Sequence, residues 1–242
     1  MDVATSFAII ALAALLHASF QLSVSMVTLL SGHAIGAKSS HARVMRLTGG
    51  FLAGVLTMTT LLLSSLGFLF TRWFGGHVPP IAWAASAGLM IGVGLAVWSF
   101  YYRREAGTAL WLPRGMAHYL TERTKATKNS AESFTLGLGS VIAEILFIIA
   151  PIIVSSLALV GLGSGWQLLG VLLYVVVSAF SLITVVMLIG GGHKISHIQR
   201  WRESNKRFLQ FAAGSGLFIL GCFIYVTTVA LATTGGGNIW VP

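Results

Sequence analysis

Six long apolar segments separated by polar connectors constrain this chain more than any other feature. A helix needs about 20 apolar residues to cross the roughly 30 Å hydrocarbon core of a bilayer. Because lipid offers the backbone no hydrogen-bond partner, each segment is predicted to be a helix. The segments are residues 6–30, 47–70, 81–102, 134–160, 166–189 and 208–233.

The composition indicates an all-α integral membrane protein. Of the 242 residues, 56% are hydrophobic and 9% are charged, with a mean hydropathy of +0.87, whereas about 25% of the residues in soluble domains are charged. The lone cysteine, Cys222, excludes an intramolecular disulfide and a paired-thiol redox site. The net charge of +9 comes from residues between the apolar segments, so the bilayer rather than nucleic acid is the expected partner.

Basic residues are concentrated in alternate connectors. Fourteen of the 15 Lys and Arg residues lie in the first, third and fifth connectors, and only Arg72 lies on the other side. Under the positive-inside rule, the chain is predicted to cross the plasma (inner) membrane six times, with both termini outside the cytoplasm.

A long connector, residues 106–132, divides this single transmembrane domain into two halves of three segments, residues 1–105 and 133–242. Because three is odd, a duplication would place the halves in opposite orientations, as a 3+3 inverted repeat. The first segment of each half carries one ionisable residue near mid-membrane, His17 or Glu144. The second segments match more loosely, Thr57, Thr60 and Ser64 in one half and Tyr174, Ser178 and Ser181 in the other.

His17 belongs to a polar stripe in the first segment. At about 100° per residue, His17, Gln21, Ser25 and Thr28 fall within roughly 80° of one another on a helix. An ionisable residue inside a membrane segment is costly unless it faces a bundle interior or a cavity. The stripe therefore predicts a site, with His17 and Gln21 at the substrate or proton and Ser25 and Thr28 along the path.

Glu144 is the only acid inside an apolar segment. Ser140, Pro151 and Ser155 share its helical face, the serines as predicted path-lining groups and the proline, which removes one helix hydrogen bond, as a predicted gating kink. Glu144 is predicted to pair with His17 and to bind substrate or a proton. A purely structural hydrogen bond between the two helices is the alternative. A metal at these two residues is a weaker hypothesis, and no cofactor is expected.

Small residues recur at helical spacing in the third and sixth segments and include Gly88, Gly92 and Gly216. Such faces let helices approach closely in lipid. They predict helix packing, either within the chain or in a homodimer.

The connectors carry further helical patterns. Ile195, Ile198 and Trp201, with basic residues between them, predict a short amphipathic helix on the cytoplasmic membrane surface, and residues 111–120 predict another interfacial element. Asn129 followed by Glu132 resembles a capping box that begins the fourth segment.

Two triplets of helices, a long central connector and the glycine- and basic-rich segment SGHAIGAKSSHARVMRLTGGFLAG resemble the LysE superfamily of small exporters and its relatives, the CcdA/DsbD membrane domains. The Pro-Gly-Pro typical of the first helix of amino-acid exporters is absent, and so are the membrane cysteines of the thiol-reductant carriers. The resemblance implies a six-helix transporter and leaves its branch unassigned.

These features predict a secondary transporter, in particular a proton-coupled exporter of a small polar or cationic solute, with its site near mid-membrane between the first and fourth segments. Metal ions and amino acids are both open as substrates. A non-transporting subunit that assembles with a partner is the second hypothesis. A membrane-embedded enzyme that uses His17 and Glu144 as an acid/base pair is the third hypothesis. It ranks last because no nucleophile or metal cluster accompanies the two residues.

Overall fold

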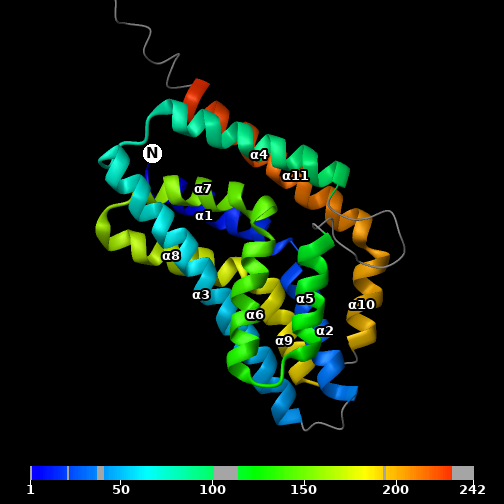
Figure 1. The fold of residues 1–242 in the computed structure, drawn as a ribbon. Helices are drawn as coiled ribbons and strands as arrows, with labels where there is room; N and C mark the ends of the chain where they lie inside the picture. Colours follow the sequence, from blue (N-terminus) through cyan, green and yellow to red (C-terminus); the bar gives the residue numbers. More distant parts are fainter. Residues whose placement is uncertain (1, 21, 37–40, 101–113, 193–194, 231–242) are drawn as a thin grey trace, which may run out of the picture.

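The structure, a computed structural model, describes residues 2–20, 22–36, 41–100, 114–192 and 195–230, and all regular elements in these ranges are helices (Figure 1). They are α1 (Val3–Ala18), α2 (Leu22–Gly36), α3 (His41–Phe74), α4 (Pro80–Phe100), α5 (Arg114–Ala126), α6 (Ser130–Ala143), α7 (Ile145–Val160), α8 (Ser164–Ser178), α9 (Phe180–Gly190), α10 (Ile195–Ser204), α11 (Lys206–Ile224) and the π-helix η1 (Tyr225–Ala230) that continues α11.

Three of the six apolar segments form single helices that are long and apolar enough to cross a membrane: α3, α4, and α11 with η1. The other three segments are each divided into two helices. The bends are 43° between α1 and α2, 81° between α6 and α7, and 51° between α8 and α9. Length and composition therefore allow three to six spans, and the prediction of one unbroken helix per segment is wrong for these three.

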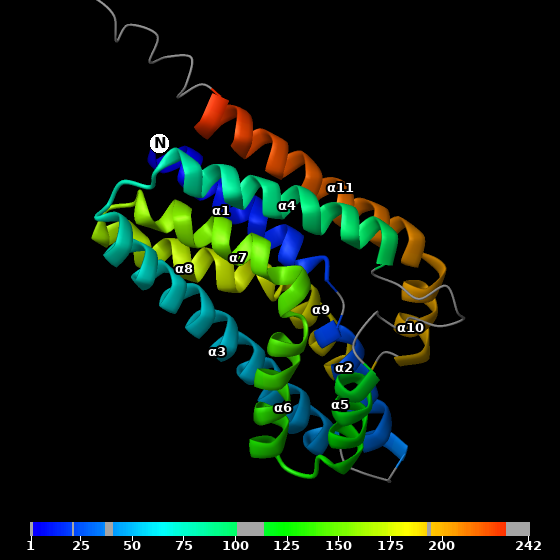
Figure 2. The ribbon, with the colours of Figure 1, turned by 45° about the horizontal axis from the view of Figure 1, so that its top comes forward.

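The helices fall into two groups that meet at the bends (Figures 1 and 2). On one side, α4 and α11 run antiparallel and side by side, and α1 packs against α7 and α8. On the other side, α2, α6 and α9 lie together, with α5 and α10 against α2. The 34-residue α3 contacts both groups, since it packs against α6, α7, α8 and α9.

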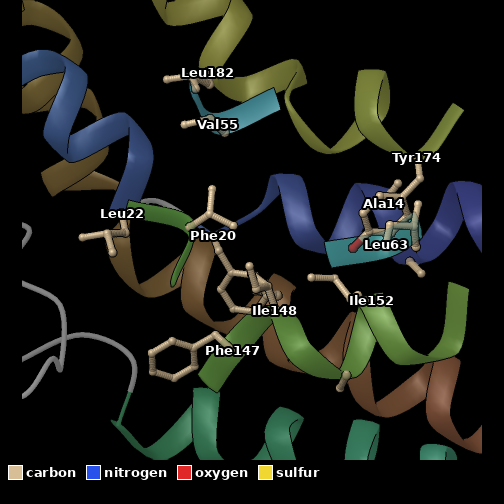
Figure 3. Close-up of a cluster of buried hydrophobic side chains, with 14 of the residues drawn as sticks. Ala14, Phe20, Leu22, Val55, Leu63, Phe147, Ile148, Ile152, Tyr174 and Leu182 are labelled. Atoms are coloured by element: carbon tan, nitrogen blue, oxygen red, sulfur yellow. The ribbon is translucent and has the colours of Figure 1, made fainter. Parts of the chain in front are cut away.

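The core is centred on α7, in which twelve of 16 residues are buried. This helix is apolar on every face, as expected of a helix surrounded by other helices. At its first turn, Phe147 stacks on Phe20, with ring centroids 5.9 Å apart, beside Ile148 (Figure 3).

Glycines permit the closest helix contacts, but not at all of the predicted positions. A Cβ at Gly137 of α6 would overlap Phe51 O of α3 and lie 3.1 Å from the Cα of Gly54. Gly216 lies against Leu16 of α1. Gly88 and Gly92, in contrast, are exposed, with no atom of the described chain within 4 Å of a Cβ there. Packing at those two positions stays a prediction that requires a partner.

The connectors form two helices and a helix cap, which the sequence predicts in part. The N-cap half of the predicted capping box is confirmed, because Asn129 Oδ1 accepts a hydrogen bond from Glu132 N (2.9 Å). The Glu132 carboxylate reaches back to Lys128 N and Asn129 Nδ2. α5 and α10 are helices as predicted, but both pack against α2. Leu120 and Thr124 of α5 are buried as a result. Trp111 and Leu112, which were expected to extend the α5 pattern, lie outside the described residues.

Candidate functional site

A serine that bonds back to its own helix stands at or within four residues of each bend. The hydroxyls of Ser19, Ser140 and Ser178 each donate to the carbonyl oxygen three residues earlier, at 2.6, 2.8 and 3.1 Å. Such bonds favour bending, but they do not by themselves cause a break, because Thr57 and Thr60 make similar bonds in the unbroken α3. Pro151, where a kink is predicted, stands inside α7, and the 81° bend lies at Glu144 instead.

The three bends also meet in space, around one small cavity. Its lining comes from both sides of the α1–α2 and α8–α9 bends, from Glu144 at the α6–α7 bend and from α3. It comprises His17, Ala18, Phe20, Ser23, Val24, Val55, Glu144, Ser178, Ala179, Ser181 and Leu182. The centre of a water molecule can occupy about 20 Å³ of it, and one buried water needs about 10–15 Å³. The cavity therefore has room for one water or one small ion in this conformation.

Glu144 lies between α6 and α7 and is 4% exposed. Its Oε1 accepts a hydrogen bond from Leu22 N, the first amide of α2, at 3.0 Å. The first amides of a helix have no partner within the helix, and the positive end of the helix dipole favours a carboxylate there. Glu144 thus caps α2 from another segment while it stands at the start of α7.

His17 is bonded to a residue other than its predicted partner. Its Nδ1 is 3.0 Å from the hydroxyl of Tyr174, which is fully buried in α8. Among the described residues, His17 makes no hydrogen bond to Glu144, although both line the cavity. In this conformation the two ionisable residues are therefore neighbours with separate partners, rather than the predicted bonded pair.

Hydroxyl groups connect the bends to one another. Ser181 of α9 donates to the carbonyl oxygen of Ala18, the last residue of α1, at 2.7 Å. Ser23 of α2 lies 3.4 Å from Ser140 of α6, oxygen to oxygen. In an apolar interior, such bonds replace those that the interrupted helices lack.

The remaining predicted residues divide between α2 and α7. Thr28 is buried and donates to Ser25 O (2.8 Å), so both continue along α2 from the cavity. Ser155 is buried in α7, away from the cavity lining, and its hydroxyl has no hydrogen-bond partner in the described structure. Gln21 lies outside the described residues.

The sequence reasoning missed Arg202, which is 2% exposed. Its Nη2 donates to the Ser25 hydroxyl at 2.8 Å, about one helical turn along α2 from the amide that Glu144 caps. A signal was present, because Ile195, Ile198 and Arg202 fall on one face of a helix. Trp201, which is assigned to that face in the sequence prediction, is 59% exposed.

The cavity, which has room for one water molecule, is lined by the carboxyl of Glu144 and the imidazole of His17, and the phenol of Tyr174 is bonded to His17. These groups can exchange a proton or bind a small cation. In the described ranges, no group of three or more His, Cys, Asp or Glu side chains is placed to hold a metal. A metal bound at His17 and Glu144, the weaker hypothesis, would therefore lack a third ligand of these types.

No protein-family model, no curated protein and no solved structure matches the chain significantly. The resemblance to the LysE superfamily therefore stays a prediction.

Proposed function

We propose that the chain is a secondary transporter that moves a small polar or cationic solute, coupled to protons, through the site at the three bends. One observation carries the proposal: three interrupted segments meet at a cavity lined by Glu144 and His17. In secondary transporters, discontinuous helices near mid-membrane typically form the substrate and ion sites.

The proposal includes six spans arranged as an inverted repeat, with both termini outside the cytoplasm. The helix pairing supports this arrangement. α1 packs against α7, which joins the first segments of the two halves, and α4 packs against α11, which joins the third segments. α3, the second segment of the first half, packs against α6 and α7, which form the first segment of the second half. In the same way, α8 of the second half's second segment packs against α1 of the first half's first segment. This reciprocal pattern is expected of two halves related by a two-fold axis.

In the proposed mechanism, Glu144 exchanges partners. Its Oε1 accepts from Leu22 N in the present conformation. A proton makes the carboxylate a neutral acid, which accepts from this amide more weakly than the ionised group, and a bound cation draws on the same oxygens. The weaker cap lets the start of α2 move, and the bends allow α2 and α6 to move relative to α1 and α7. His17 and Tyr174 then relay or retain the proton beside the solute.

Reconstitution into liposomes tests this function. Proteoliposomes containing a pH-sensitive dye are challenged with Mn²⁺, K⁺ or L-lysine under an imposed pH gradient. We expect at least one solute to move together with protons, and Glu144→Gln to reduce the coupled flux to that of empty liposomes. Glu122→Gln removes an exposed carboxylate that is paired with Lys125 and is the matched control. Coupled flux that is unchanged in Glu144→Gln would contradict the proposal.

A non-transporting subunit is the second candidate, and the exposure of Gly88 and Gly92 favours it. Both glycines are exposed and an added Cβ at either one meets nothing within 4 Å, so the double Leu variant is expected to fold. It should prevent assembly with a partner if these residues form the interface. The mass of the detergent-solubilised particle, measured by light scattering, distinguishes this candidate from a monomeric transporter.

A further inference from the structure

A groove between α5 and α6 lies outside the site at the bends and has a volume of about 430 Å³. The two helices lie side by side at the end of the molecule away from α4 (Figures 1 and 2). One face of each helix lines the groove, with Tyr119 and Arg123 from α5 and Glu132, Leu136, Gly139 and Ile142 from α6.

The groove exists because both helices are held from their other faces. Ser133 of α6 donates to Leu47 O of α3 at 2.6 Å, and Gly137 lies against Phe51. Thr124 of α5 contacts Met26 of α2. At the groove, Gly139 presents no side chain, and nothing lies within 4 Å of where its Cβ would be.

One end of the groove carries two opposite charges, Arg123 and Glu132, that are not in direct contact. Arg123 Nε donates to the Tyr119 hydroxyl at 3.4 Å, and its guanidinium lies over the Tyr119 ring. The hydrogen bond that Arg123 donates to Tyr119 raises the pKa of Arg123. Glu132 accepts from Lys128 N and Asn129 Nδ2. Within the described residues, Arg123 and Glu132 form no salt bridge with each other.

The rest of the groove is mainly apolar, with Thr135 as a polar group among its lining residues, and it is about one leaflet long. From Glu132, at the charged end, to Ile142, α6 rises about 15 Å, which is half of the roughly 30 Å hydrocarbon core. Leu136, Leu138 and Ile142 line this part, and Ile142 is 49% exposed. The groove thus has a polar end and a mainly apolar length that match the headgroup and one acyl chain of a phospholipid.

We propose that this groove binds a single phospholipid with a zwitterionic, primary-amine headgroup of the ethanolamine type. The phosphate lies at Arg123, the ammonium group lies at Glu132, and one acyl chain follows α6 past Gly139 to Ile142. Under the predicted orientation the lipid belongs to the cytoplasmic leaflet. The proposal requires only that α6 lies in a membrane and does not depend on transport.

The charge pattern selects this headgroup over two others. A headgroup with a phosphate but no amine would bring a negative charge near the Glu132 carboxylate and supply no cation for that carboxylate. A quaternary choline nitrogen carries no N–H to donate to that carboxylate. A primary ammonium carries three donors, like that of lysine, and a phosphate accepts charge-assisted bonds from a guanidinium.

The test uses the full chain reconstituted in vesicles of equimolar phosphatidylethanolamine, phosphatidylglycerol and phosphatidylcholine, followed by extraction and native mass spectrometry of the retained lipid. We expect one phosphatidylethanolamine per chain. Arg123→Gln should retain about tenfold less lipid, since it removes the charged phosphate contact. Lys125→Gln, which removes one charge from the same helix outside the groove, should retain as much as wild type.

Two further variants address the other parts of the groove. Glu132→Gln should abolish the preference for phosphatidylethanolamine over phosphatidylglycerol. Gly139→Leu fills the apolar part and should reduce retention about tenfold, whereas Gly49→Leu, at an exposed glycine of α3 that also has open space, should not. Equal retention in all variants, equal losses in Arg123→Gln and Lys125→Gln, or a wild-type preference for phosphatidylglycerol would each overturn the proposal.

Discussion

The interrupted segments and the continuous helices bury different parts of the chain. In α3, α4, and α11 with η1, only 28%, 33% and 33% of the apolar stretch is buried, so most of each of these helices lies at the periphery of the molecule. The interrupted segments contain the central helix α7 and both His17 and Glu144. The comparison indicates that the continuous helices serve as a scaffold. The backbone is irregular only where neighbouring segments can supply the hydrogen bonds that an interrupted helix lacks.

The largest expected effect tests the scaffold through two glycines of α6. A Cβ at Gly137 overlaps the backbone of α3, which cannot move without separating the helices. We expect Gly137→Ala to lower the unfolding free energy by about 3 kcal/mol. Gly139→Ala, two residues away in open space, should raise it by about 0.5–1 kcal/mol. Thermal unfolding in detergent measures both, and equal effects would show that α3 does not hold α6.

The second effect tests whether Glu144 holds the bend. Glu144→Leu leaves Leu22 N without its acceptor, at a cost of about 1–3 kcal/mol. Glu144→Gln keeps a carbonyl oxygen as acceptor and should lose less than half of that. Hydrogen exchange at the Leu22 amide should accelerate in Glu144→Leu only. If both variants exchange like wild type, Glu144 does not cap α2.

The third effect concerns α2, which is held by Glu144 at its first amide and by Arg202 at the Ser25 hydroxyl. Arg202→Met and Ser25→Ala should show a coupling free energy of about 1–2 kcal/mol in a double-mutant cycle, because the bond between them is partly buried and involves a charged donor. Arg200→Met, on the exposed face of α10, should change stability by less than about 0.5 kcal/mol. A coupling near zero would show that α10 does not fix α2.

The smallest effect concerns the hydrogen bond between α1 and α8. Tyr174→Phe keeps the packing and removes the hydroxyl bonded to His17, which should lower the unfolding free energy by about 1 kcal/mol. Tyr225→Phe removes an exposed hydroxyl and should have no measurable effect. Indistinguishable losses in the two variants would mean that the bond does not join the segments.

Much of this fold could be predicted because its signals are local. A run of apolar residues is visible without knowing its neighbours, and so is the Asn129–Glu132 capping box. Arg202 was missed although its position on a helical face was readable, because an arginine in a polar connector fits a solvated surface equally well. Only the contact with Ser25 distinguishes a buried arginine from an exposed one.

The sequence by itself determined that the chain is helical and apolar, and that His17 and Glu144 stand inside apolar segments. Tertiary structure decided where the helices break and which groups bond there. A serine can bond back to its own helix in many sequences without breaking it. A break in an apolar interior persists only where another segment supplies the missing partner, as Glu144 does for Leu22 and Ser181 does for Ala18.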